Sequence, residues 1–175
     1  MTKAMLFLVS LCLLATPLGA VSSEPVVTEG LVNGPVEAVW KAYTVKSAIE
    51  AWMVAKTEME LKVGGTWRTS YSKDSNLNDE MAIHQTILAF DPGRMIAFRT
   101  IKIPKNFPYP AVMNTWVVVY FEPAGAGKTR VTARMMGFED DEQGQKMRAF
   151  FERGNKQEFD ALVKFFENGV PQVVR

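Results

Sequence analysis

The sequence predicts an α+β fold in which a curved antiparallel sheet packs against one long C-terminal helix. Between residues 58 and 136, strand-like segments rich in β-branched and aromatic side chains alternate with short turn sequences. Strands joined by such short turns must run antiparallel, because a parallel return needs a crossover of a dozen or more residues. A helix with an aromatic face then occupies residues 142–167.

One strand and two short helices are predicted before this sheet. Residues 26–32 are rich in β-branched side chains, which indicates a first strand. Pro35 then opens a helix, because proline suits the first helical position, where its missing N–H would lack a partner anyway. Ser47 and Glu50 stand at the spacing of a capping box and predict a second short helix that ends at Met53.

Turn sequences divide the rest of the sheet. We expect strands at residues 58–62, 66–71, 81–90, 95–101, 112–122 and 129–136. The segment 125–129 ends like a phosphate-binding loop, but Glu122 stands where the first glycine of that motif belongs. A strand pattern, not a helix, follows the segment. We therefore interpret it as a hairpin turn.

The C-terminal helix carries one apolar face. Its members recur every three or four residues: Met147, Phe150, Phe151, Phe159, Leu162, Val163 and Phe166. The acidic run 139–142 directly precedes the helix, where carboxylates satisfy free N–H groups and favour the positive end of the dipole. Helix capping is therefore favoured over calcium binding, for which the run lacks alternating ligands and a glycine. The predicted domain spans residues 26–168, and a short tail at 169–175 follows.

Residues 1–20 have the order of a secretory signal peptide. A positive start at Lys3 precedes an apolar run over residues 4–15, and small residues end the segment. The apolar run is shorter than the roughly 20 residues that a membrane span needs. Cleavage is expected after Ala20 or Ser22. A lipoprotein anchor at Cys12 is the disfavoured alternative, since a leucine precedes that cysteine where a small residue is expected.

Export shapes the chemistry that the mature chain can perform. Cleavage removes the single cysteine, which excludes thiol nucleophiles and disulfides. It also removes one of the 20 basic residues and none of the 19 acidic ones, so the mature chain is formally neutral. Neutrality argues against nucleic acid as a partner. The lack of disulfides and of a glycosylation sequon favours a bacterial periplasm over eukaryotic secretion. No further run of membrane length follows, so we expect no transmembrane segment after cleavage.

Five segments, in order, resemble one known family. They are Gly34–Thr44, Ala51–Met53, Val63–Arg68, Leu88–Phe98, and Thr129–Thr132 with the following Gly137-Phe138. Over residues 26–167 the chain resembles the START-like helix-grip superfamily, also called SRPBCC. Within that superfamily it is most similar to the family named for activators of the Hsp ATPase.

The resemblance implies a helix-grip fold, with a cavity between the sheet and the C-terminal helix that often holds a hydrophobic ligand. It does not imply one function, because relatives include lipid carriers, aromatic cyclases and co-chaperones of a cytosolic ATPase. The expected export is incompatible with a cytosolic chaperone partner. Ala89 stands where relatives often carry an acid, so chemistry that depends on that acid is not expected here.

A set of aromatic, methionine and glycine positions forms the candidate ligand site. We expect these residues to converge on the cavity: Trp52, Trp67, Tyr71, Met113, Trp116, Met135, Phe150, Phe151 and Gly154. Plain core packing is the alternative for each large side chain. A glycine inside a helix costs about 1 kcal/mol relative to alanine, so either close approach to the sheet or space for a ligand would explain Gly154.

Two polar residues complete the candidate set. His84 is the only histidine. The two faces of its strand carry nearly equal numbers of apolar residues, so the alternation does not decide which face of the sheet the histidine lies on. Arg99 lies on a strand, where it either pairs with a ligand carboxylate or occupies an edge or an internal ion pair. One histidine without cysteine is a poor zinc site, so no metal or cofactor is predicted. The stiff segment 103–110 is either a lid over the cavity or a packed loop.

Three functions remain open from the sequence. The first is an exported domain that binds an apolar or amphipathic small molecule. The second is a cyclase- or hydratase-like enzyme with His84 and Tyr71 as the proton-transfer pair. The third is a protein-interaction module with a filled core and no ligand. A cavity without a paired acid and base favours the first, a perturbed His84 in the cavity the second, and a solid interior the third.

Overall fold

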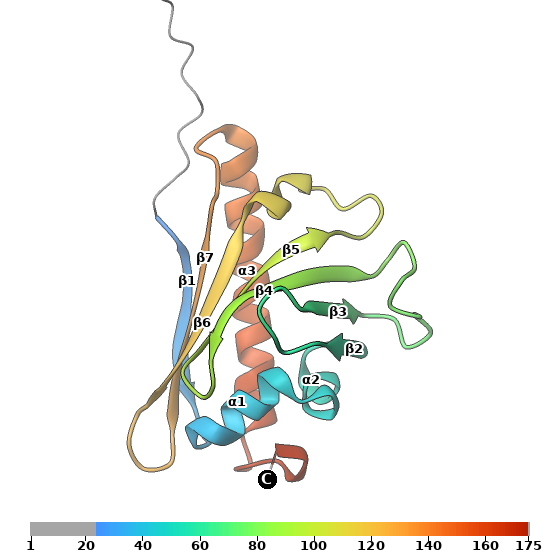
Figure 1. Ribbon diagram of the computed structural model, residues 1–175. Coiled ribbons are helices and arrows are strands. Elements are labelled where there is room, and N and C mark those ends of the chain that lie inside the picture. The colour runs from blue at the N-terminus through green and yellow to red at the C-terminus, as the bar shows by residue number, and fades with distance from the viewer. Residues whose placement is uncertain (1–23, 175) are drawn as a thin grey trace, which may run out of the picture.

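The computed structural model describes residues 24–174, so the predicted signal peptide at residues 1–20 lies outside the described residues. Figure 1 shows a curved sheet that covers one long helix, with two short helices below. The elements are β1 (Val26–Val32), α1 (Val36–Thr44), α2 (Lys46–Trp52), β2 (Lys56–Met59), β3 (Thr66–Ser70), β4 (Ile83–Asp91), β5 (Met95–Lys102), η1 (Pro110–Asn114), β6 (Trp116–Pro123), β7 (Thr129–Met136), α3 (Glu142–Phe165) and η2 (Gln172–Val174).

The seven strands form one antiparallel sheet in the order β1-β7-β6-β5-β4-β3-β2. The first strand of the chain therefore pairs with the last, while α1 and α2 fill the connection from β1 to β2. The long helix α3 runs behind the sheet (Figure 1). This is the helix-grip arrangement that the sequence predicts.

Most predicted strands are present, with shifted ends. The bounds of β1 and β7 are as predicted, and positive φ angles at residues 125–127 make the expected turn between β6 and β7. β6 begins at Trp116 instead of residue 112, because the stretch that starts at Pro110 forms a 3-10 turn. β2 is Lys56–Met59 instead of residues 58–62.

The predicted capping box at α2 is wrong. Val45 is the N-cap residue, and no side chain caps the helix. Glu50 has a different role: its carboxylate accepts a hydrogen bond of 2.9 Å from the Thr57 backbone N–H and pairs with Lys46 at 2.9 Å. The glutamate thus joins α2 to β2, which a local sequence pattern does not reveal.

Two glycines let α3 approach the start of the domain closely. A Cβ atom built on Gly30 of β1 would lie 2.5 Å from the Phe159 ring, and one on Gly34 would lie 2.7 Å from the Phe166 ring. A larger residue at either position would require the Phe159 or Phe166 ring to move. The lower part of α3 is therefore packed tightly against the rest of the domain.

Both ends of α3 are well defined. The Asp141 carboxylate accepts a hydrogen bond of 2.7 Å from the Gly144 N–H, which is the capping role that the acidic run predicts. Beyond the helix, Val174 of η2 is buried in the core that α1 and α2 also form. Within residues 24–174, no helix is long and apolar enough to span a membrane.

Candidate ligand-binding cavity

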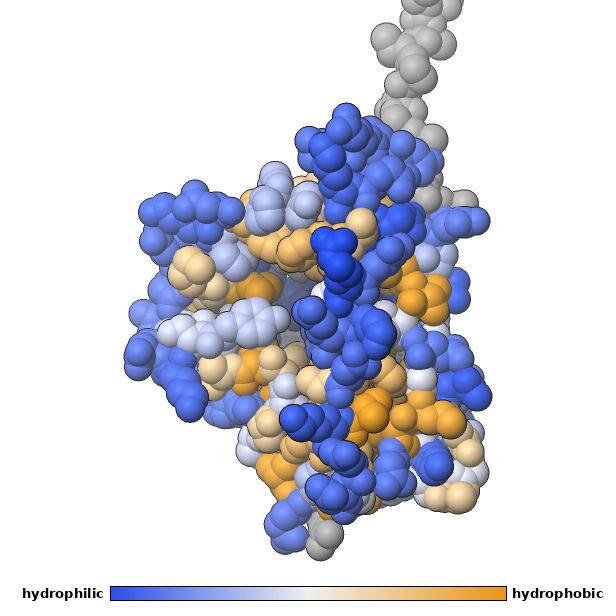
Figure 2. All heavy atoms as spheres, turned by 180° about the vertical axis from the view of Figure 1, so that it is seen from behind, coloured by the Kyte–Doolittle hydropathy of each residue, from blue (hydrophilic) through white to orange (hydrophobic). Residues whose placement is uncertain are grey.

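A cavity of about 330 Å³ lies between the inner face of the sheet and the middle of α3. Most of its lining side chains are apolar, and they come from six of the strands, α1, the residues that follow α2, α3 and the segment 103–115. Seen from behind, the molecule is hollowed beside α3, whose outer face is hydrophilic, and hydrophobic side chains are visible in the walls (Figure 2). The cavity is open to solvent on one side.

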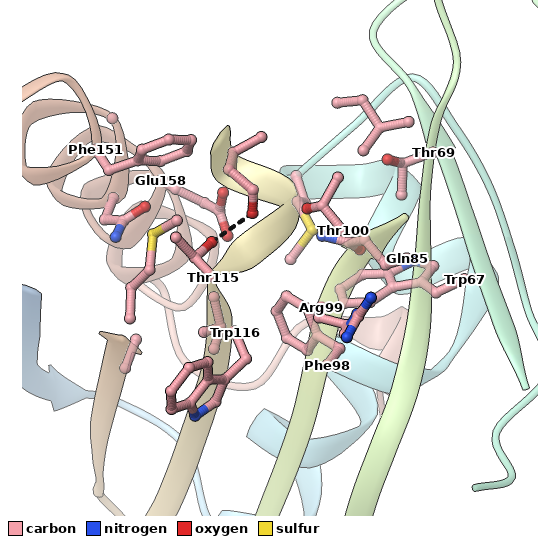
Figure 3. A pocket seen from close by; sticks show the side chains of 18 of the residues that line it. Trp67, Thr69, Gln85, Phe98, Arg99, Thr100, Thr115, Trp116, Phe151 and Glu158 are labelled. Atoms are coloured by element: carbon pink, nitrogen blue, oxygen red, sulfur yellow. Dashed lines mark hydrogen bonds between the residues drawn. The ribbon is translucent and has the colours of Figure 1, made fainter. Parts of the chain in front are cut away.

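Eight of the eleven predicted site residues line this cavity: Trp67, Tyr71, Arg99, Trp116, Met135, Phe150, Phe151 and Gly154. Figure 3 shows Phe151 on α3 facing Trp67, Gln85 and Phe98 on the strands, with open space between them. These residues therefore share one cavity. Their contact with a ligand stays a prediction.

Trp52 and Met113 do not line the cavity, which corrects the sequence prediction. The Trp52 indole N–H donates a 2.9 Å hydrogen bond to the Ala42 carbonyl, and its ring packs edge-to-face on Tyr43. Met113 packs against the small cluster around Val112. Both side chains therefore pack in the core, Trp52 from α2 and Met113 from η1.

His84 also lies outside the cavity, on the outer face of the sheet. Ile83 and Gln85 line the cavity, so the residue between them points away. Its Nε2 lies 2.8 Å from the Leu77 carbonyl oxygen, to which the ring donates a hydrogen bond. Further along β4 the pairing with β5 is irregular between Ile87 and Ala89, and both Ile87 and Phe90 pack in the core, so simple strand parity could not decide the face of His84.

Trp67 forms a rigid part of the wall. It is only 2% exposed, its indole N–H donates a 2.9 Å hydrogen bond to Thr57 Oγ1, and its ring meets Phe98 edge-to-face at 5.0 Å. These contacts hold the ring in place whether or not the cavity is filled. Trp67 is thus both a core residue and a lining residue.

Arg99 and Trp116 reach the cavity at a place where the sheet separates. The last paired residues of β5 and β6 are Phe98 and Val117. Arg99 and Trp116 follow directly beyond that pair, and both are exposed (Figure 3). The internal ion pair considered for Arg99 is not found, since the arginine forms no ion pair with any residue of the described range.

The segment 103–110 is a packed loop that closes one end of the cavity. Phe107 lines the cavity and contacts Phe150 at a ring distance of 5.8 Å. Tyr109 packs on Phe150 as well, at 5.2 Å. The segment is therefore packed on α3 as a loop, and it also forms part of the cavity wall.

Gly154 faces empty space. A Cβ atom built on it would meet no heavy atom of another part of the chain within 4 Å. Close approach to the sheet, one of the two explanations offered for this glycine, is therefore wrong. What the missing side chain leaves is volume in the cavity.

Glu158 is the lining residue that the sequence prediction missed. It lies one helical turn after Gly154 and one turn before Leu162, on the same face of α3, and its side chain is drawn in Figure 3. The signal was available: a charged residue stands on an otherwise apolar stripe. Within residues 24–174 its carboxylate has no hydrogen-bond or ion-pair partner, and no group of three or more candidate metal ligands occurs.

Burial raises the pKa of Glu158 from the ordinary 4.5 to about 7. The side chain is nevertheless exposed, because it lines a cavity that is open to solvent. Burial, and secondarily the Glu158 charge, raises the pKa of Tyr43 and of Tyr71 above 10. Tyr71 is 71% exposed and also lines the cavity, so it lies at the rim.

The fold and this cavity define the class of protein. The chain has a helix-grip domain, and residues 33–167 match the family model described as Activator of Hsp90 ATPase homolog 1-like protein. Since the match covers most of the chain, the protein belongs to that family. No curated protein matches the chain significantly.

Solved structures with the same fold share little sequence with this chain. A Mesorhizobium loti protein is 20% identical, with a TM-score of 0.65 over 83% of this chain and 98% of the other. CalU16 from Micromonospora echinospora is 18% identical, with a TM-score of 0.60 over 83% and 75% of the two chains. Norcoclaurine synthase from Thalictrum flavum is 12% identical, with a TM-score of 0.60 over 91% and 98%. At these identities the comparison supports the fold alone.

Proposed function

We propose that this protein is exported and binds an apolar or amphipathic small molecule in the cavity beside α3. One observation carries the proposal: Gly154, in the middle of α3, faces open space, and a Cβ atom built on it would meet no atom of the sheet within 4 Å. Protein interiors are usually packed as densely as organic crystals. A cavity of about 330 Å³ with mostly apolar walls is therefore an exception that a ligand would explain.

Two further facts support a small molecule as the occupant. The cavity volume is at the lower end of the range of about 300–1,000 Å³ that is typical of small-molecule sites. The norcoclaurine synthase structure, which has the same fold, was determined in complex with dopamine and hydroxybenzaldehyde. Both are small molecules of a size that suits such a volume.

The two alternative functions have less support. The enzyme hypothesis relied on His84 and Tyr71 as a pair, and His84 is bonded to Leu77 on the outer face of the sheet. The interaction-module hypothesis expected a filled interior, and the interior holds a cavity. Export to a periplasm or another extracellular compartment rests on the signal-peptide pattern of residues 1–20.

Ligand binding can be tested with a neutral fluorescent probe and a variant that fills the cavity. The protein is expressed with its own N-terminus in a bacterial host and purified from the periplasm. Nile red, which fluoresces in apolar surroundings, should bind the wild type. Gly154→Leu should abolish binding, because its side chain would occupy open cavity space. Gln157→Leu places the same side chain at an exposed position of α3 outside the cavity and should bind like wild type.

Each result has a defined meaning. Nile red binding that survives Gly154→Leu would contradict the cavity as the site. No binding to any of the three proteins, with correctly folded chains, would count against an apolar ligand. A periplasmic product whose mass begins after Ala20 or Ser22 would confirm export, and a cytosolic, uncleaved chain would overturn it.

A further inference from the structure

The ionisable groups that line the cavity are unevenly distributed. Within the described residues they are Glu158, Tyr43, Tyr71 and Arg99. Glu158 is the only carboxylate. Arg99 is the only cation, and it is exposed where β5 and β6 separate, with no ion pair to Glu158. The carboxylate therefore has no positive partner in the cavity.

An unpaired carboxylate in such a site is unfavourable. Apolar surroundings disfavour the charged form unless an opposite charge or hydrogen-bond donors compensate for the lost water. Burial accordingly raises the pKa of Glu158 above its ordinary value. The same site would be well suited to a ligand that brings a positive charge and N–H donors. Such a ligand would also meet the aromatic rings of Tyr43 and Tyr71, which attract cations.

We infer that Glu158 selects ligands with a protonated amine head group, so that the ligand is an amphipathic cation with an apolar body. This inference rests on the proposed function. The apolar body fills the space beside Gly154 and the sheet, and the ammonium group donates hydrogen bonds to the Glu158 carboxylate. A charged pair of this kind is stronger than a neutral hydrogen bond. An anionic head group would be repelled at the same place.

Three probes that differ only in the head group test the inference. Isothermal titration calorimetry at pH 8 compares decylamine, decanol and decanoate on the wild-type protein. The affinity for decylamine should be at least about tenfold higher than the affinity for decanol, as expected for a hydrogen bond to a charged group. Decanoate should bind more weakly than decanol. Equal affinity for decylamine and decanol would overturn the inference.

A matched pair of variants assigns the preference to one carboxylate. Glu158→Gln keeps the shape of the side chain and removes its charge, so it should abolish the preference for the amine while decanol affinity is kept. Glu152→Gln removes a charge from an exposed position of the same helix outside the cavity and should change neither. An amine preference that persists in Glu158→Gln would contradict the assignment.

The pH dependence gives an independent readout. Lowering the pH from 8 to 5.5 protonates Glu158, so the amine preference should decline, while decanol binding stays constant. Tyr43 and Tyr71 stay protonated because burial raises their pKa values above 10. His84 lies outside the cavity, and His84→Gln should leave the profile unchanged. A flat profile in the wild type would overturn the inference.

Failure of this inference is distinguishable from failure of the proposed function. If decanol binds and decylamine binds no better, the cavity takes apolar ligands but Glu158 does not select a cation. If none of the three probes binds, the proposed function itself fails.

Discussion

The two ends of α3 and its middle form different surroundings on one helix face. Near the C-terminal end, Leu162 and Phe166 are completely buried in the main core. Near the N-terminal end, Met147 is buried in a second cluster. Between these ends, Gly154 and Glu158 face an open cavity. The helix is thus held by packing at both ends, while Gly154 in its middle faces open space.

This difference shows how a small domain can keep an internal space. A cavity tends to collapse unless its walls are held by other contacts. Here Trp67 is fixed by its hydrogen bond to Thr57 and its contact with Phe98, and the ends of α3 are fixed by the two clusters. The walls therefore need no filling side chain from the middle of the helix.

The largest effect on the free energy of unfolding is expected at the packed C-terminal end of α3. Leu162→Ala should lower the free energy of unfolding by about 2–5 kcal/mol, because it removes a completely buried side chain and leaves a void. Urea denaturation measures the change. A loss well below 1 kcal/mol would show that this end of α3 is no better packed than its middle.

Glu158→Gln should have an intermediate effect on the free energy of unfolding, and this effect should depend on pH. Burial raises its pKa from 4.5 to about 7, so the folded protein binds this proton more tightly than the unfolded chain. The resulting stability is fully present below about pH 4.5 and is lost as the pH rises through 7. Glu158→Gln lacks this contribution.

The test is urea denaturation of both proteins from pH 4.5 to 8.5. The stability of the wild type relative to Glu158→Gln should decline with rising pH and level off above about pH 8. All other titrating groups are common to the two proteins and cancel in the difference. A difference that is independent of pH would contradict the perturbed carboxyl group.

A smaller effect of opposite sign is expected at Gly154. Gly154→Ala should raise the free energy of unfolding by up to about 1 kcal/mol, because alanine is the better helix former and its Cβ meets no atom. The same measurement reports it. A destabilised Gly154→Ala protein would show that the middle of α3 is packed after all.

The smallest effect is expected outside the cavity. His84→Gln should leave the affinity for Nile red unchanged and lower stability by no more than about 1 kcal/mol, through the hydrogen bond to Leu77. A large loss of Nile red binding in this variant would show that His84 contributes to the binding site.

The sequence predicts the fold well because its signals are local. Turn residues and the β-branched pattern mark β1 and β7, and the aromatic repeat marks α3. The errors arise where contacts distant in sequence decide. Glu50 bonds to Thr57 of β2 instead of capping α2, and the irregular pairing between Ile87 and Ala89 changes which residues of β4 face inward.

The candidate site is predictable only in part. An apolar repeat gives the same pattern for a core residue as for a cavity wall, so Trp52 could not be told from Trp67. The position of Glu158 on the apolar stripe of α3 is readable from the sequence. The lack of an ion-pair partner for Glu158 among the described residues is not readable from the sequence, because it depends on which side chains of the sheet lie opposite α3.

The most direct test of a ligand-binding cavity is native mass spectrometry of the mature protein from its own export compartment. The account predicts a stoichiometric adduct that is released on denaturation and is absent from Gly154→Leu. An amine in the released molecule would support the role of Glu158 as well. A clean protein mass for the wild type, together with no binding of Nile red or decylamine, would contradict the account.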